Sequence, residues 1–226
     1  MRTLVISDTH LDSAFDTKKF NFLKKIIKKA DRVIINGDFW EGYKITFDTF
    51  VNSPWKKLFP LLKEKKAIYL YGNHDKESYV DKRVNLFSVK QAKRYRFTSG
   101  KNTFFLEHGD RLAPLWDKFF RRMPSFILIP LDNLERFLVQ IFGRAFLRFF
   151  YGRFNKKIKE KIEDYIGKNE FFIFGHIPVQ EIDRKNHFIN GGFIKYGIGQ
   201  YLFIEEGRVT LKEEWYGRPL FKADNR

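Results

Sequence analysis

The sequence predicts an α/β domain whose strands are largely buried and parallel. Short apolar runs, at residues 4–6, 33–35 and 67–71, each end in a cluster of polar residues, and helical patterns lie between them. Strands that alternate with helices in this way are typical of α/β sheets covered on both faces. With 226 residues, 43% of them hydrophobic, the chain can bury the core of one large domain. We therefore expect a single domain over residues 1–226.

The elements follow one another in a regular order. Residues 20–30 predict an amphipathic helix with Leu23, Ile26, Ile27 and Ala30 inward, and the lysines of residues 18–29, Lys19 among them, are expected to solvate a helix face. We expect a second helix at residues 58–66 and strands at residues 4–6, 33–35, 67–71, 103–106, 171–174, 188–190, 201–204 and 209–213. Residues 111–166 break the alternation, because they have a helical pattern and no obvious strand. They predict a helical insertion within the domain.

Composition excludes several classes of protein. The chain has no cysteine, so a disulfide framework, a cysteine nucleophile and a thiolate metal site are all excluded. No apolar run approaches the roughly 18 residues that a membrane span needs, and the short run at residues 4–6 is no signal peptide. The net charge of +16 favours phosphate-bearing partners. We expect a cytoplasmic protein, with peripheral binding to the inner face of the membrane as a further possibility.

Polar clusters with histidine follow the predicted strands. The clusters are Asp8-Thr9-His10, Gly37-Asp38, Gly72-Asn73-His74-Asp75, His108-Gly109-Asp110 and Gly175-His176. A single histidine in such a place is most often structural, but four at the same topological position predict a convergent site at one edge of the sheet. Nitrogen and oxygen donors without sulfur suit manganese, iron or zinc better than calcium. One aspartate can bridge two ions about 3.5–4 Å apart, so the chemistry indicated is hydrolysis of a phosphate ester or anhydride.

In this order, these clusters resemble the motif blocks of the calcineurin-like metallophosphoesterases. The resemblance covers residues 8–178, and it implies a four-layer α/β/β/α sandwich with a helical cap inserted at residues 111–166. It also implies a dinuclear metal-dependent phosphohydrolase with two divalent metal ions. Manganese is the expected metal, with iron and zinc as the alternatives.

The resemblance assigns a role to each matching residue. Asp8 and His10 would bind the first metal, Asp38 would bridge, and Asn73, His108 and His176 would bind the second, with Asn73 also placed to contact substrate. His74 would not be a ligand but would face the phosphoryl group as a catalytic residue. Its ring needs an orienting carboxylate, for which Glu41 is one candidate and Asp75 the other.

One position departs from the family pattern. Many members have Gly-His-x-His in the last block, but here the second histidine is replaced by Pro178. Either water completes the first metal site, as in the protein-phosphatase branch, or that site binds its ion weakly. We expect unequal affinities for the two metals. His187 could substitute in principle, but its place just before a strand favours a surface or structural role.

The predicted insertion combines aromatic and basic side chains. Arg121, Arg122, Arg148 and Arg153 are candidate substrate contacts, and no acidic residue occurs between positions 137 and 159. The simplest interpretation is a pair of helices with apolar faces packed inward. The alternatives are a cap over an amphiphilic phosphate-bearing substrate and a surface helix bound to anionic lipid.

Among the branches of the family, this layout is most similar to the UDP-2,3-diacylglucosamine hydrolases of lipid A synthesis. They cleave a pyrophosphate next to a lipid, and they differ from this chain at His74 and Pro178. A lipid-linked nucleotide is therefore the expected substrate, with a nucleotide, protein or nucleic-acid phosphatase or phosphodiesterase as the alternative. Nucleic acid is the less favoured partner, because the aromatic residues fall at helical spacing. A scaffold without catalysis is the third hypothesis.

Overall fold

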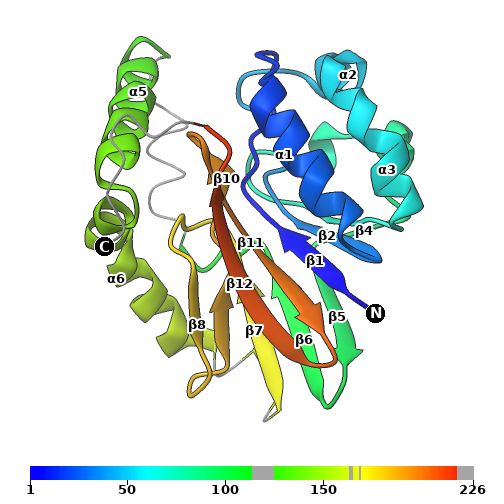
Figure 1. Cartoon of the computed structure of the whole chain (residues 1–226), viewed down its shortest axis with the longest axis vertical. Coiled ribbons are helices and arrows are strands. Elements are labelled where there is room, and N and C mark those ends of the chain that lie inside the picture. The colour runs from blue at the N-terminus through cyan, green and yellow to red at the C-terminus, as the bar shows by residue number, and fades with distance from the viewer. Residues whose placement is uncertain (114–124, 163–164, 168, 218–226) are drawn as a thin grey trace.

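Two β-sheets lie face to face at the centre of the molecule, with helices on both outer sides (Figure 1). This computed structural model describes residues 1–113, 125–162, 165–167 and 169–217. Helices α1 (Thr17–Lys28), α2 (Phe47–Asn52) and α3 (Phe59–Glu64) cover one side, and α5 (Ser125–Phe142) and α6 (Arg144–Ile162) the other. The α/β class and the four layers are confirmed.

The first sheet holds the predicted parallel strands. Its order is β10 (Ile194–Lys195), β11 (Ile198–Glu205), β1 (Thr3–Ile6), β2 (Arg32–Asn36), β3 (Ile68–Leu70) and β4 (Lys90–Ala92), and β12 (Arg208–Trp215) pairs with β11. Neighbours from β1 to β4 are parallel, whereas β11 runs antiparallel to β1. The carboxyl ends of β1, β2 and β3 therefore meet at one edge.

The second sheet brings the later clusters to the same region. Its order is β5 (Arg94–Ser99), β6 (Asn102–Glu107), β7 (Glu170–Phe174), β9 (Phe188–Asn190) and β8 (Glu181–Asp183). Strands β6, β7 and β9 are parallel to one another. Short 3₁₀ helices at Pro54–Leu58, Glu77–Tyr79 and Lys82–Leu86 complete the connections. Strands β4, β5, β8 and β10 and helix α2 were not predicted from the sequence.

Alternation along the strands builds three apolar layers. In β1, Leu4 and Ile6 join the core under α1 and α3, whereas Val5 points to the layer between the two sheets. A third layer packs the outer face of the second sheet against α6, through Leu147, Ile158 and Ile162. Buried strands on both faces explain why these runs are almost continuously apolar.

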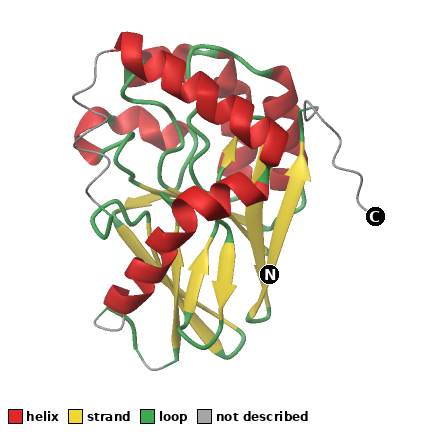
Figure 2. Ribbon diagram, turned by 90° about the vertical axis from the view of Figure 1, so that its left-hand side faces the viewer, coloured by secondary structure: helices red, strands yellow, loops and turns green. Residues whose placement is uncertain are grey.

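Helices α1 and α6 follow the expected inward packing, and α5 does not. Val139 of α5 is buried, but Leu131, Leu134 and Phe137 are exposed. Figure 2 views the molecule from the side of α5 and α6, where the ribbon of α6 crosses in front of the strands. Among the described residues, no helix is both long and apolar enough to cross a membrane.

Candidate metal centre

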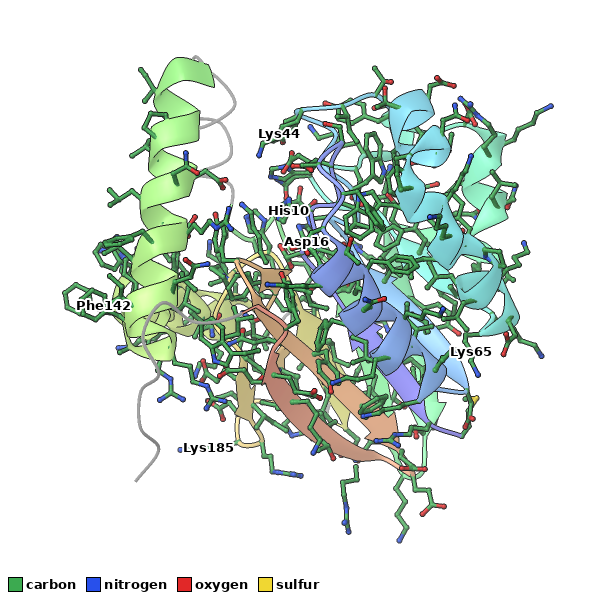
Figure 3. The ribbon with its side chains drawn as sticks, turned by 45° about the horizontal axis from the view of Figure 1, so that its top comes forward. His10, Asp16, Lys44, Lys65, Phe142 and Lys185 are labelled. Atoms are coloured by element: carbon green, nitrogen blue, oxygen red, sulfur yellow. The ribbon has the colours of Figure 1, made fainter. Side chains whose placement is uncertain are left out.

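The predicted ligands converge at one edge of the two sheets. Each lies within four residues of the end of a strand: Asp8 and His10 after β1, Asp38 after β2, Asn73 after β3, His108 after β6 and His176 after β7. Figure 3 shows His10 between the ribbons of α5 and α1. The two sheets therefore bring together residues that lie far apart in the sequence.

Asp8, His10 and Asp38 form a first cluster. Their ligand atoms lie within 4.8 Å of one another. His10 Nε2 is 4.0 Å from Asp8 Oδ1 and 3.9 Å from Asp38 Oδ2, so the nitrogen and both carboxylates face a common point. Backbone N–H groups hold both carboxylates, since Asp8 Oδ2 accepts from His176 N at 2.9 Å and Asp38 Oδ1 from His74 N at 2.9 Å.

Asp38, His108 and His176 form a second cluster that shares Asp38 with the first. Their ligand atoms also lie within 4.8 Å of one another. His108 Nε2 is 3.2 Å from Asp38 Oδ2 and 3.0 Å from Asn73 Oδ1. The position of Asp38 in both clusters is the one that a bridging carboxylate needs.

The surroundings of His108 show that a cation fits this cluster. Its Nδ1 lies 2.9 Å from the carbonyl oxygen of Asn36, which can only accept, so Nδ1 carries a proton. In a neutral ring, Nε2 would then turn its lone pair toward the oxygens of Asp38 and Asn73. Three electron-rich atoms in a buried place need a proton or a metal ion between them. Burial lowers the pKa of His108, but Asp38 and Asp8 outweigh this effect and raise the pKa well above its ordinary value.

The Asp8 carboxylate shows the same excess of negative charge. Burial, together with the repulsion from Asp38, raises the pKa of Asp8 to about 7. Burial also lowers the pKa of His176 to about 3, so this ring is neutral at physiological pH and its unprotonated nitrogen can act as a ligand. Two divalent cations, bound by Asp8, His10 and Asp38 and by Asp38, Asn73, His108 and His176, would compensate the negative charge of the two carboxylates.

Glu41 holds two imidazoles at once. Its Oε2 lies 3.0 Å from His10 Nδ1, and its Oε1 lies 2.5 Å from His74 Nδ1. Burial raises the pKa of Glu41, but the hydrogen bonds from the two rings outweigh burial and leave the pKa well below its ordinary value. An ionised Glu41 therefore accepts from both Nδ1 atoms and directs both Nε2 atoms toward Asp38, which lies 3.9 Å from each.

The backbone at the centre is strained. Among the described residues, eight other than glycine have a positive φ, and four of them are Asp8, His10, Asp38 and His176. Such conformations cost of order 1–3 kcal/mol each and cluster at functional sites. Gly72 shows how close the loops approach, because a Cβ at this position would lie 2.2 Å from Asp38 Oδ1.

A family model for calcineurin-like phosphoesterases matches residues 1–208 of the chain. The chain belongs to the calcineurin-like phosphoesterase family. The resemblance seen in the motif blocks is thereby confirmed, and the chain is a metal-dependent phosphohydrolase. No curated protein sequence gives a significant match.

Solved structures share the fold at low sequence identity. Yfce, a phosphoesterase from E. coli, is 14% identical with a TM-score of 0.50, and the match covers 96% of this chain and 100% of that chain. A predicted phosphoesterase from Streptococcus pneumoniae TIGR4 is 14% identical (98% and 93% covered, TM-score 0.46), and a dimetal phosphatase from Danio rerio is 11% identical (96% and 97% covered, TM-score 0.44). The match to Yfce supports the phosphoesterase fold.

Asp75 has a different position from the one expected of a catalytic residue in this phosphoesterase. Its carboxylate is fully buried and accepts from the backbone N–H groups of Asp38 at 3.0 Å, Phe39 at 2.6 Å and Gly72 at 2.7 Å. Asp75 thus ties the β2 and β3 loops together. Of the two candidates for orienting His74, Glu41 makes the contact.

Two further positions concern the first metal. Pro178 leaves that cluster with Asp8, His10 and Asp38, and His187 does not replace the missing ligand. The ring of His187 stacks on Phe171 at a centroid distance of 4.9 Å, near the start of β7, at the other end of that strand from His176. The expectation of unequal metal affinities stays a prediction.

A cavity of about 630 Å³ opens beside the first cluster and is lined by His10 and Glu41. Arg148 and Arg153 are exposed on α6 and are not among its lining residues, so the structure does not bring them to the metal centre. Arg121 and Arg122 lie outside the described residues. In the described part of the chain, the cationic side chains that line the cavity are Lys18, Lys19, Lys44, Arg136 and Lys195.

Sequence reasoning missed two features of the site. The contact of Glu41 with His10 depends on ring orientation, which no spacing reveals. The lysine-rich pattern of residues 18–29 predicted that Lys19 lies in water, but Lys19 is buried and donates to the carbonyl oxygen of Thr9. Thr9 lies between the predicted ligands Asp8 and His10 in the sequence. Only the structure shows that Lys19 contacts this residue.

Proposed function

We propose that this phosphoesterase hydrolyses the pyrophosphate of a lipid-linked nucleotide, with UDP-2,3-diacylglucosamine as the expected substrate and two manganese ions as cofactors. In this reaction a water oxygen bonds to one phosphorus and the bond from that phosphorus to the bridging oxygen breaks. The bridging oxygen leaves with the electron pair, and the products are UMP and a lipid sugar phosphate. When bound, the metal ions lower the pKa of water and compensate charge at phosphorus.

Hydrogen bonds within the protein orient the metal ligands. Backbone N–H groups of His176 and His74 fix one oxygen of Asp8 and one of Asp38, which leaves the other oxygens for the metals. His10 presents Nε2 to the first metal because Glu41 accepts from its Nδ1. Each ligand is thereby oriented before substrate binds, which is what fast chemistry at a fixed site needs.

His74 is placed to act on the substrate rather than on a metal. Glu41 accepts from its Nδ1, and Tyr43 lies over its ring at a centroid distance of 4.1 Å. Held from two directions, the ring turns Nε2 toward the side of Asp38. A proton on Nε2 is then available to the leaving oxygen, or to a charged phosphoryl oxygen.

The orientation of α5 is the observation that carries the lipid proposal. Asp132, Arg136 and Gln140, spaced four residues apart and therefore on one face of the helix, line the cavity beside the metal centre. On other faces, Leu134 is 53% and Phe137 49% exposed. A helix that turns polar side chains to the protein and apolar ones away is built for an apolar partner outside the protein.

Helix α6 adds positive charge to the same side of the molecule. Phe149 is 82% exposed, and the exposed Arg148, Lys156 and Lys157 form no ion pair with any residue in the described ranges. Phe142 at the end of α5 points away from the sheets in Figure 3. Apolar side chains among unpaired cations favour an anionic lipid surface, so we place the enzyme peripherally on the inner face of the membrane.

Release of UMP from UDP-2,3-diacylglucosamine in mixed detergent micelles tests the proposal. We expect manganese-dependent turnover, at least a hundredfold higher in kcat/KM than that of UDP-glucose, which has the same diphosphate but no acyl chains. Bis(p-nitrophenyl) phosphate serves as the control for an intact metal centre.

Two results would contradict the proposal. The first is hydrolysis of bis(p-nitrophenyl) phosphate without turnover of the lipid nucleotide. The second is faster cleavage of oligonucleotides than of the lipid nucleotide, with binding that weakens steeply as salt increases, which would favour the nuclease alternative.

A further inference from the structure

The cavity between α1 and α5 contains more positive charge than its own acidic residues compensate. Among the residues that the structure describes, five cationic and four acidic side chains line it, and the acidic ones are Asp12, Asp16, Glu41 and Asp132. The cations come from separate parts of the fold: α1, the segment after β2, α5 and β10.

The four carboxylates are already engaged. Asp16 caps α1 by accepting from the N–H groups of Lys18 and Lys19, and Asp12 accepts from Ala14 N at 2.8 Å. Glu41 is taken by the two histidines. Asp132 lies 2.6 Å from Lys195 Nζ and also accepts from Tyr196 OH at 2.7 Å. Among the described residues, Lys195 is therefore the one lining cation with a carboxylate partner.

Lys19 is the most unusual of these cations. It is only 7% exposed, and within the described parts of the chain no carboxylate lies within ion-pair distance of its ammonium. The ammonium has three N–H donors, and the carbonyl of Thr9 accepts one of them. Burial, and then repulsion from Lys195, lowers the pKa of Lys19 to about 7. A buried cation facing a second lysine is a place where a bound anion would be stabilised.

The location of Lys19 connects the cavity to the chemistry. Thr9 lies between Asp8 and His10 in the sequence, and consecutive Cα atoms are about 3.8 Å apart. The same cavity is lined by His10 and Glu41. An anion at Lys19 therefore lies next to the first metal cluster, where a second phosphate joined to the reacting one would be.

We propose that this cavity is the subsite for the second phosphate of a diphosphate-linked substrate, and that Lys19 is the residue that binds it, with Arg136 of α5 on the opposite wall. This deepens the proposed function, because it names the part of the substrate that decides specificity. The subsite also distinguishes two classes of substrate at the same metal pair. A single-phosphate ester gains no affinity from Lys19, whereas a diphosphate does.

The test compares two inert ligands, methylenediphosphonate and methylphosphonate, on the manganese-loaded protein. Dissociation constants from calorimetry and inhibition constants against bis(p-nitrophenyl) phosphate are measured for the wild type, Lys19→Met, Lys19→Arg and Lys24→Met. Lys24 is exposed on the outer side of α1 and does not line the cavity, so it is the matched control.

In the wild type and in Lys24→Met we expect the diphosphonate to bind at least thirtyfold tighter than the monophosphonate. Lys19→Met should reduce this ratio at least tenfold, and Lys19→Arg should restore most of it. Equal weakening of both ligands would show that Lys19 only supports the Thr9 loop, and an unchanged ratio would exclude Lys19 from binding; either result overturns the inference.

Two provisions keep the test decisive. If Lys19→Met does not fold, Arg136→Met on the exposed side of the cavity is measured in the same way, and we expect its ratio to fall at least threefold; an unchanged ratio there overturns the inference. Because neither ligand is a lipid, the ratio is measured even if UDP-2,3-diacylglucosamine is not cleaved. Failure of the proposed function and failure of the subsite are thus separate outcomes.

Discussion

Helices α1 and α5 border the same cavity but are built in opposite ways. In α1, Phe22, Leu23, Ile26 and Ile27 are buried in the core, and most lysines of the helix face water. In α5, the polar Asp132, Arg136 and Gln140 face the cavity, and apolar side chains are exposed. Hydrophobic periodicity predicts an apolar and a polar face in both helices, but only the structure shows which face packs on the protein.

This difference indicates that the two helices have different roles. The apolar face of α1 stabilises the sheet that carries the metal ligands, since it closes the core layer below β1 and β2. Among the described side chains of α5, Val139 is the fully buried one, and it packs in the separate core layer between the second sheet and α6. An exposed apolar stripe costs solubility, and this is the reason why we propose a lipid partner for the outer face.

Truncation of one leucine in each helix tests this contrast, and its effect should be the largest. Leu23 is fully buried, so Leu23→Ala should lower the free energy of unfolding by about 2–5 kcal/mol. Leu134 is 53% exposed, so Leu134→Ala should change it by less than about 0.5 kcal/mol. Urea unfolding followed by tryptophan fluorescence measures both. A loss of similar size for Leu134→Ala would mean that the apolar face of α5 packs on the protein.

The next contrast concerns two glutamates, each of which lies within hydrogen-bond distance of two side chains. Glu41 holds His10 and His74, whereas Glu135 of α5 accepts from Tyr151 OH at 2.6 Å and lies 2.9 Å from Tyr196 OH. Glu41→Gln offers one accepting oxygen instead of two, so it should lower both manganese affinity and kcat for bis(p-nitrophenyl) phosphate by about 10–100-fold.

Glu135→Gln is the matched control for this experiment. It should lower the free energy of unfolding by about 1 kcal/mol and leave manganese affinity unchanged, because its partners hold α5 and not the metal ligands. If the two variants lower manganese affinity to the same degree, Glu41 has no special role in orienting the histidines.

The ligand residues could be predicted because their positions follow from topology. A polar residue directly after a buried parallel strand must lie at the carboxyl edge of the sheet, and this holds for Asp8, Asp38 and His108 alike. The layered fold follows from the same strands. By contrast, β5 could not be predicted from the sequence. It contains Arg94 and Arg96, so this edge strand has no continuous apolar run.

Contacts that depend on side-chain direction could not be predicted. Lys19 belongs by sequence to a row of solvated lysines, and only the packing of α1 over the Thr9 loop buries it. Charge alone suggests Arg148 and Arg153 as substrate contacts, but both side chains are exposed on α6. The sequence offers Glu41 beside His74, with Asp75 as the competing candidate, and only the backbone contacts of Asp75 and the contact of Glu41 with His74 distinguish them.

The manganese content of the protein tests the central claim most directly. After metal removal and dialysis against manganese, the wild type should retain two ions per chain, bound with unequal affinities. Asp38→Asn should retain fewer than one, because Asp38 belongs to both clusters. A wild-type chain that binds no manganese, or an Asp38→Asn variant that keeps two ions, would contradict a metal centre built on these residues.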